Sequence, residues 1–401
     1  MEAMSPQVIQ GISPDALRDT KAPGVYELQS FGLPSRTFFS TGVPVFFGTM
    51  ASPTPKIAKE TLPTPHMLSL WSQFPSHIGE PRRGCALAYA VRGFFQNGGH
   101  WCYVVVLKDR SDSQLAAGLQ AIADLPSIDL IGVPDLSGKP AEALDQQQMV
   151  VDHCEDLGNR FAILDSHLGD APAEIGARGS AITGRNGALY YPWVRVNGFT
   201  GDLETVPPCG HVAGVINRVD RTRGVHKAPA NEVLSGVIDL EYRLTNHDQE
   251  SLNPQGVNCL RAFPGRGIRI WGARTLSSQS DWMYVNVRRL FLTAARWLDW
   301  NLLEMDFEPN DSRLWARIER KLTEFFAEQY RMGALKGASL KEAFYVKCDA
   351  ETNPPELRES GQVITEIGLA PAVPFEFIVV RLIRGSRGAS ASGNSTTVTT
   401  T

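Results

Sequence analysis

The 401-residue sequence has no run of the roughly eighteen apolar residues that a helix needs to cross a membrane. Its first residues do not show the basic segment followed by an apolar segment that is typical of a secretory signal. There is also no excess of basic residues, since 39 Lys and Arg stand against 43 Asp and Glu, for a formal net charge of −4. We therefore expect a soluble protein that is synthesised in the cytoplasm, binds no nucleic acid and inserts into no membrane.

Motifs that hold metals or disulfides are missing too. The six cysteines form no CxxC pair, which predicts that they are buried as small apolar side chains in a reducing compartment. The eight histidines show no HExxH or other paired spacing. We expect neither a metal nor a cofactor. The cysteines are Cys85, Cys102, Cys154, Cys209, Cys259 and Cys348.

No catalytic motif can be found either. Ser180, in the segment ARGSAITG, lacks the GxSxG pattern that places a nucleophile on a sharp strand-to-helix turn. The GRG triplet at 265–267 could bind a phosphate, but a tight turn before the predicted strand IRIWGA explains the same glycines. We therefore predict that the protein is not an enzyme.

What the sequence does contain is a regular alternation of helices and strands between residues 86 and 196. Short connections between such elements are typical of a parallel sheet with helices on both faces. The predicted strands cover 101–107, 128–134, 160–165 and 188–196, and the predicted helices cover 86–95, 141–157 and a segment capped by Ser111 or Ser113.

Three of these strands end at or just before an aspartate: Asp109, Asp135 and Asp165. The carboxyl ends of parallel strands meet at one edge of the sheet, where α/β proteins bind their ligands, so a ligand site is possible here. Turn and helix-cap roles are the commoner explanation for such aspartates. No glycine-rich fingerprint follows the first strand, so a nucleotide site is poorly supported.

The C-terminal third predicts two long helices and two strands. The first helix includes 287–298, and the second begins after Pro309. Strands are predicted over 362–371 and 375–383. Both faces of the last strand are apolar for much of its length, which is unusual for an edge strand and indicates that another strand completes its sheet. Three arginines lie around the apolar stripe of the first helix: Arg288, Arg289 and Arg296.

Both ends and one internal segment lack such periodicity. Residues 1–22 have the character of an extended arm that does not pack on its own chain. Residues 50–84 contain six prolines and predict irregular structure on the surface. Residues 385–401, GSRGASASGNSTTVTTT, favour a disordered tail, although their β-branched residues would suit a strand if a partner supplied the sheet.

The second half of the chain carries long ordered segments of a recognisable kind. They are APGVY at 22–26, YYPWVRV at 190–196, VPPCGHVAGVINRVDRTRGVHKAPAN at 206–231, LTNHDQESLNPQGVNCLRAFPGRGIRIWGARTLSS at 244–278, DWMYVNVRRL at 281–290, FEPND at 307–311, GALKGASLKEAFYVKCD at 333–349 and VITEIGLAPAVPFEFIVVRL at 363–382. These segments resemble the tail sheath proteins of contractile phage tails, tailocins and extracellular contractile injection systems. The resemblance covers nearly all of 190–384, whereas 27–190 is similar only in pattern.

The resemblance implies an architecture. An α/β core with the shape of subtilisin but without its catalytic triad would occupy 23–275, and a C-terminal α+β domain would occupy 276–384. Extended arms at 1–22 and 385–401 would add strands to the sheets of neighbouring copies. The residues expected in this strand exchange between subunits are Val25, Tyr26, Phe375, Phe377, Val379 and Val398.

The resemblance also implies a mechanical function. The chain would be a structural sheath subunit that polymerises helically, as stacked rings, around an inner tube and contracts to drive the tube through a target envelope. Its partners would be other copies of itself, the inner tube protein, and baseplate and tail-terminator or cap proteins, with sister sheath proteins as a further candidate. Two alternatives stay open: a baseplate or accessory component that uses the sheath fold and, less favoured, a hydrolase on the subtilisin-like core.

One surface is predicted to contact the tube. From Arg313 to Glu342, seven basic residues stand against four acidic ones, a net charge of +3 within an acidic protein. Exposed charge contacts are weak and screened by salt, so a basic face could hold an acidic tube and release it. An ordinary solvated helix face is an equal alternative. The expected tube-contact residues are Arg313, Arg317, Arg320, Lys321, Arg331 and Lys336.

Overall fold

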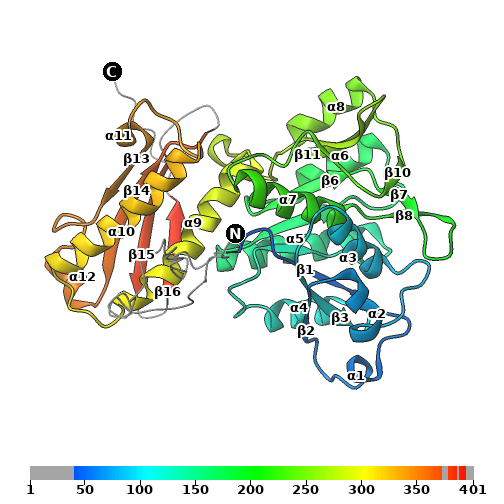
Figure 1. Cartoon of the computed structure of the whole chain (residues 1–401), viewed down its shortest axis with the longest axis horizontal. Coiled ribbons are helices and arrows are strands. Elements are labelled where there is room, and N and C mark those ends of the chain that lie inside the picture. Colours follow the sequence, from blue (N-terminus) through cyan, green and yellow to red (C-terminus); the bar gives the residue numbers. More distant parts are fainter. Residues whose placement is uncertain (1–39, 373–377, 386–387, 394–401) are drawn as a thin grey trace, which may run out of the picture. The chain divides into compact units, whose positions relative to one another are not determined.

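A computed structural model of the chain describes residues 40–372, 378–385 and 388–393, the last two segments by their backbone only (Figure 1). The described helices and strands all belong to one compact unit, residues 41–401. Several predictions fall outside the described residues. These are the arm 1–22, residues 386–387 and 394–401 of the C-terminal tail and, among the strand-exchange residues, Val25, Tyr26, Phe375, Phe377 and Val398. The described part of the tail forms a strand over Gly388–Gly393, so the disorder that its composition favours is not found there.

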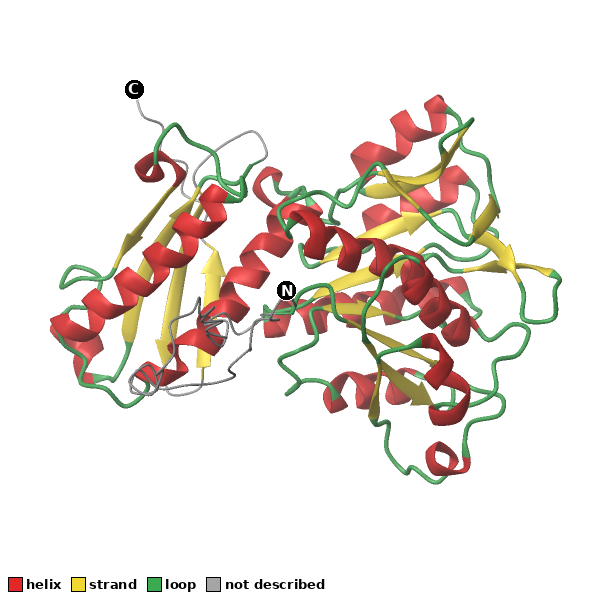
Figure 2. Cartoon of the chain, in the orientation of Figure 1, coloured by secondary structure: helices red, strands yellow, loops and turns green. Residues whose placement is uncertain are grey.

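The largest sheet has nine strands and is mostly parallel (Figure 2). Six neighbouring strands, from β3 to β11, run parallel, and β2, β12 and β9 are antiparallel at the two edges. The order across the sheet is β2 (Pro65–Leu68), β3 (Cys102–Leu107), β1 (Pro44–Thr49), β4 (Leu130–Gly132), β5 (Phe161–Asp165), β6 (Gly187–Tyr191), β11 (Val257–Phe263), β12 (Gly267–Trp271) and β9 (Glu232–Val233). Because β1 lies between β3 and β4, the order of the parallel strands reverses at β1.

Helices cover both faces of this sheet, which confirms the layered arrangement that the alternation of elements predicts. One face packs against α3 (Ala86–Gln96) and α7 (Cys209–Arg223). The other packs against α4 (Asp112–Ala121), α5 (Pro140–Leu157), α6 (Pro172–Ala181) and α8 (Asn246–Leu252). Along β1, Phe46 joins the first core, whereas Val45 and Phe47 join the second, because successive side chains of a strand point to opposite faces.

One predicted helix cap and most of the predicted cysteine environments are found in the structure. The Ser111 hydroxyl accepts a hydrogen bond from the Gln114 N–H at 3.4 Å and so caps α4. Five of the six cysteines are buried, as predicted, and only Cys85 is partly exposed.

Proline changes the predicted pattern at two places. The strand predicted over 188–196 is broken at Pro192 into β6 and β7 (Val194–Asn197), and β7 belongs to a second sheet with β8 (Leu203–Val206) and β10 (Val237–Leu240). The segment 50–84 is not wholly irregular, because it contains α1 (Pro55–Ala58), β2, η2 (Trp71–Gln73) and α2 (Phe74–His77). A proline is compatible with β2 because Pro65 is its first residue and β2 lies at the edge of the sheet.

The C-terminal part combines two long helices with a four-stranded antiparallel sheet. In Figure 2, α10 (Ser312–Arg331), capped by Asp311, lies along this sheet and shares a core with it. The other long helix, α9 (Val285–Leu302), contributes to that core and, through Val285 and Leu292, to the core of the large sheet. The sheet order is β13 (Phe344–Lys347), β14 (Val363–Leu369), β15 (Ile378–Gly385) and β16 (Gly388–Gly393), and the short helices are η3 (Asn253–Gln255), η4 (Ser280–Trp282), η5 (Leu303–Met305), α11 (Leu340–Ala343) and α12 (Pro355–Glu359).

Candidate functional site

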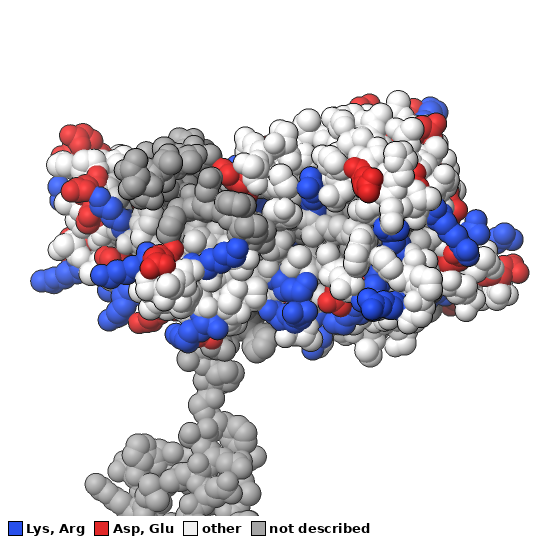
Figure 3. Space-filling view, turned by 90° about the horizontal axis from the view of Figure 1, so that it is seen from above, with Lys and Arg blue, Asp and Glu red and all other residues white. Residues whose placement is uncertain are grey.

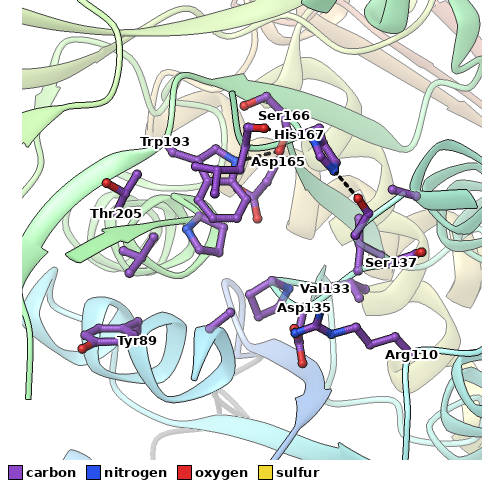
Figure 4. A pocket seen from close by; sticks show the side chains of 18 of the residues that line it. Tyr89, Arg110, Val133, Asp135, Ser137, Asp165, Ser166, His167, Trp193 and Thr205 are labelled. Carbon is purple, nitrogen blue, oxygen red and sulfur yellow. Dashed lines mark hydrogen bonds and ion pairs between the residues drawn. The ribbon is translucent and has the colours of Figure 1, made fainter. Parts of the chain in front are cut away.

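Of the three aspartates at the strand ends, the structure brings two together. Asp135 and Asp165 line a cavity of about 390 Å³ beside the carboxyl ends of β4 and β5 (Figure 4). Asp109 does not line it. Its Oδ1 accepts hydrogen bonds from the Ser111 N–H (2.9 Å) and hydroxyl (2.5 Å), which lower the pKa of Asp109. Asp109 therefore has the turn-and-cap role, and the ligand-site alternative applies to the other two.

The carboxylate of Asp135 is fully partnered. Arg110 approaches its Oδ1 at 2.6 Å. Thr49, the last residue of β1, donates to its Oδ2 from the backbone N–H at 2.9 Å and from the hydroxyl at 2.5 Å. These contacts tie the ends of β1 and β4 together at the point where the strand order reverses.

Asp165 is buried without a basic partner among the residues that the structure describes. Its Oδ1 accepts a hydrogen bond from the N–H of Cys209, the first residue of α7, at 2.7 Å. Its Oδ2 accepts none from any described residue. Burial raises the pKa of Asp165 to about 7. Burial and the nearby carboxylate also raise the pKa of the Cys209 thiol, which makes it a poor nucleophile.

The polar residues of the cavity do not form a catalytic pair. The His167 Nδ1 lies 3.0 Å from the carbonyl oxygen of Leu168, and its Nε2 lies 3.2 Å from that of Gly138. Ser166 precedes His167 in the sequence and carries a hydroxyl, but this hydroxyl has no hydrogen-bond partner among the described residues. A serine nucleophile needs a base within hydrogen-bond reach, so this arrangement does not activate one. Within the described ranges, no group of three or more His, Cys, Asp and Glu could hold a metal ion.

Two buried polar atoms in this cavity were missed by the sequence analysis. The Gln147 Oε1 and the Ser166 Oγ, like the Asp165 Oδ2, have no partner among the described residues. Gln147 and its neighbour Gln146 are both buried in α5, which packs on the sheet. Two adjacent glutamines in a helix predicted to cover the sheet could have pointed to Gln147. Ser166 gave no signal beyond its place directly after β5.

The predicted tube-contact residues lie on α10 and in the loop after it. Five of them are exposed, and Lys321 is partly buried. Three form ion pairs with acids of the same chain: Arg317 with Glu308, Lys321 with Glu304 and Arg331 with Glu328. Among the described residues, Arg313, Arg320 and Lys336 make no ion pair. On the face in Figure 3, Lys and Arg gather along the lower margin with Asp and Glu interspersed.

A network of buried charges connects α9 to the large sheet and to α7. Arg289 donates two hydrogen bonds to Asp220, at 2.9 and 2.7 Å, and one to Asp129 at 3.1 Å. Arg296 lies 3.5 Å from Asp129, which also accepts hydrogen bonds from the backbone at the start of β1. The Arg289 side chain is only 3% exposed, and the two carboxylates hold its pKa above the usual value.

Arg288, Arg289 and Arg296 were predicted to lie around the apolar stripe of this helix, and all three are buried. The Arg288 Nε donates to the Asn186 Oδ1 at 2.5 Å, and Arg296 donates to the carbonyl oxygen of Pro126 at 2.9 Å. The whole circumference of α9 is covered at these positions, because the helix packs between two cores.

Of the residues predicted to take part in strand exchange, the structure describes the backbone of one. Val379 lies in β15, where it pairs with Gly368 of β14. On its other side β15 pairs with β16 of the same chain. Exchange with another copy therefore stays a prediction.

Comparisons with known proteins agree with this architecture. The family model of the phage tail sheath protein central domain matches residues 104–276. The tail sheath protein of Vibrio phage KVP40 is 24% identical over 188 residues, which is 46% of this chain and 27% of that relative. The chain thus matches little more than a quarter of the length of that curated relative.

Solved structures match over a much larger share. The helical sheath of the anti-feeding prophage, in its contracted state, is 31% identical, with a TM-score of 0.73 over 90% of this chain and 98% of the other. The contracted PVC sheath complex, an extracellular contractile injection system, is 28% identical, with a TM-score of 0.72 over 90% and 96%. The fold and these likenesses define the class, that of the sheath proteins of contractile tails and contractile injection systems. The chain belongs to the phage tail sheath protein family.

Proposed function

We propose that this protein is a structural sheath subunit that polymerises helically around an inner tube and contracts to drive the tube through a target envelope. The observation that carries the proposal is the likeness to a contracted helical sheath, at 31% identity and over 98% of that chain. Because 90% of this chain takes part, the correspondence extends beyond the central domain to the C-terminal helices and sheet.

The proposed partners follow from the same likeness. They are other copies of this chain, an inner tube protein, baseplate proteins, tail-terminator or cap proteins, and sister sheath proteins as a further candidate. The chain would be made in the cytoplasm and then join a phage tail or an injection particle. In the described part of the chain, no helix is long and apolar enough to cross a membrane. We do not assign an enzymatic activity, since the cavity residues form no nucleophile–base pair.

Strand exchange between copies is supported by the composition of β16, which reads GASASG. A strand of such small residues is held mainly by main-chain hydrogen bonds, so its register is weakly specified and it can be replaced by another strand. We propose that the arms 1–22 and 385–401 supply such strands between copies, and that β16 can pair with the β15 of a neighbour. The domain limits at 275/276 and 384/385 belong to the same proposal.

The α10 basic face, defined as Arg313, Arg320 and Lys336 together with the three paired residues Arg317, Lys321 and Arg331, is proposed to contact the tube. Support comes from the exposure of five of the six and from the three that have no acidic partner in the described chain. Such contacts are individually weak and screened by salt, which suits a grip that must release during contraction.

Contraction itself is proposed to be a switch between two packings of near-rigid subunits. The free energy is stored when the extended sheath assembles, so no nucleotide is hydrolysed. A difference of about a few kcal/mol per subunit, summed over many subunits, would be sufficient. The buried network around Arg289 supports rigid-body movement, because it fixes α9 to the large sheet within one copy.

Negative-stain electron microscopy tests the proposal directly. The chain would be expressed alone and together with its cognate tube protein, and the expected result is hollow or tube-filled cylinders with a regular striation. Dispersed particles in both preparations, from protein that folds and keeps both termini, would contradict a sheath function. That result would favour a baseplate or accessory role instead. The hydrolase alternative predicts esterase or protease activity. If the cavity were responsible for it, Asp165→Asn would abolish that activity.

A further inference from the structure

The cavity beside β4 and β5 has features that a sheath function does not explain. It lies beside the carboxyl ends of β4 and β5, next to the point where the strand order reverses between β1 and β4, and this edge is where open α/β sheets usually bind ligands. Its volume of about 390 Å³ is in the range of small-molecule sites. Two residues at its margin, Arg110 and Leu168, are each 48% exposed, so the cavity is open to solvent.

Three buried side chains that line the cavity leave acceptor atoms without partners. The Asp165 Oδ2, the Gln147 Oε1 and the Ser166 Oγ make no hydrogen bond with any described residue, and their side chains belong to residues that are at most 4% exposed. Unsatisfied buried polar atoms are costly and uncommon, so water or a bound solute meets them in this solvent-open cavity. The Gln147 Oε1 and the ionised Asp165 Oδ2 can only accept, so a solute that replaces water there must donate hydrogen bonds, whereas the Ser166 hydroxyl can accept or donate.

The charged residues that line the cavity indicate the sign of the charge that an occupant would carry. Asp135 is paired with Arg110, Arg178 with Asp170 at 3.1 Å, and Glu204 with Arg83 at 3.1 Å. Asp165 is the lining carboxylate that has no ion pair among the described residues, so the cavity carries one uncompensated negative charge when Asp165 is ionised. A donor of hydrogen bonds with a positive charge satisfies both requirements.

The walls favour an organic cation over a metal ion. Figure 4 places Asp165 and Trp193 on one side of the cavity and Val133 and Asp135 on the opposite side, with Tyr89 at one end. Apolar and aromatic walls suit the carbon frame and the face of a planar cation better than a hydrated metal ion. We propose that the cavity binds a small organic cation, a guanidinium or primary ammonium group, through Asp165, Gln147 and Ser166.

Isothermal titration of the full chain tests this proposal with two matched probes. Butylguanidinium carries the proposed group, and butylurea is its neutral isostere. At about pH 8, where the Asp165 carboxylate is largely ionised, butylguanidinium should bind with one site per chain, and butylurea should bind at least about tenfold more weakly, as expected for loss of a charged hydrogen bond. Equal binding of both probes, or no saturable binding of butylguanidinium, would overturn the proposal.

Three variants locate the site. Asp165→Asn keeps an oxygen that can accept from Cys209 but removes the charge, and should weaken butylguanidinium binding about tenfold or more. Ser166→Ala removes a hydroxyl that has no described partner, so the fold should be unaffected while binding falls about threefold. Asp109→Asn, at the same edge of the sheet but outside the cavity, should bind as the wild type does. If Asp165→Asn and Ser166→Ala, both folded by circular dichroism, bind like the wild type, the cavity is not the site.

The cation could be a free metabolite or a Lys or Arg side chain of a neighbouring copy. Titration of assembled particles distinguishes these sources. Binding to both the dispersed and the assembled protein indicates a free ligand, whereas binding to the dispersed protein alone indicates that a neighbour's side chain fills the cavity. The inference does not rest on sheath assembly, because titration of the dispersed chain decides it even if no cylinders form.

Discussion

Replacing Arg289 with methionine is the sharpest test of how the two cores are held together. Methionine has a similar length and no charge, so Arg289→Met removes both hydrogen bonds to Asp220 and the one to Asp129. Asp129 keeps Arg296 and two backbone donors, whereas Asp220 loses its only ion pair among the described residues. The damage should therefore fall mainly on Asp220.

The magnitude follows from the burial of the pair, since the Asp220 side chain is only 1% exposed. Removing one partner of a buried ion pair typically costs about 3–5 kcal/mol, because a charge is left buried and uncompensated. We expect Arg289→Met to lower the free energy of unfolding by about this amount in denaturant titrations of the dispersed chain. A matched control, Arg320→Met on the exposed side of α10, should stay within about 0.5 kcal/mol of the wild type.

A second substitution separates charge from packing. In Arg289→Met/Asp220→Asn no unpaired carboxylate remains, so more than half of the lost free energy should return. Acid should also help Arg289→Met. Its Asp220 would have a higher pKa folded than unfolded, so its folded state binds more protons, and its free energy of unfolding should rise as the pH falls towards about 4. If Arg289→Met costs less than about 1 kcal/mol, or the double variant is no more stable, the network is not what holds α9.

Four further predictions concern other parts of the molecule. The pKa of Asp165 is about 7 in the folded state and near 4 in the unfolded state. Its contribution to the free energy of unfolding is therefore fully present below pH 4 and falls by about 4 kcal/mol as the pH rises to 7. Asp165→Asn should remove this pH dependence in denaturant titrations. Gly210→Ala should destabilise by about 1–3 kcal/mol despite a better helix propensity, because its Cβ would lie 2.1 Å from the Ala90 carbonyl oxygen, and thermal melts would show it. Reversing three charges of the α10 basic face, at Arg320, Lys321 and Lys336, to Glu should lower the fraction of tube-filled particles counted by electron microscopy, and unchanged occupancy would reject the tube contact. Deleting residues 1–22, or residues 394–401 beyond β16, should leave a folded monomer that forms no sheath, and normal sheaths from a shortened chain would reject strand exchange for that arm.

Much of the α/β part could be predicted because its elements are regular. The strands predicted over 101–107, 128–134 and 160–165 correspond to β3, β4 and β5, and the short links between them leave a parallel sheet as the simplest arrangement. The central strand β1, which holds Phe46, was not predicted. The break at Pro192 could have been read from proline alone, since a proline within a predicted strand argues against a single element. The strand β2 could not, because its position depends on pairing with β3, which no local pattern reveals.

Only some of the residues that line the candidate cavity could be predicted from the sequence. Strand ends pointed to Asp135 and Asp165, but equally to Asp109, and which carboxylates meet is decided by the order of the strands in space. The polar partners on α5 and after β5 come together only in the folded chain. The ion pairs of Arg289 could not be predicted for a related reason, because its partners Asp129 and Asp220 lie 160 and 69 residues away in the sequence.

The difference in burial between the two sets of charges has a practical consequence for purification. Salt at molar strength shortens the reach of exposed charges to about 3 Å, yet it hardly weakens a pair that water does not touch, such as Arg289 with Asp220. Raising the ionic strength should thus loosen contacts made by the α10 basic face while leaving the interior of each copy unchanged. Salt would then release the tube from the sheath without unfolding any copy, whereas strand pairing between copies, which depends on main-chain hydrogen bonds, would persist.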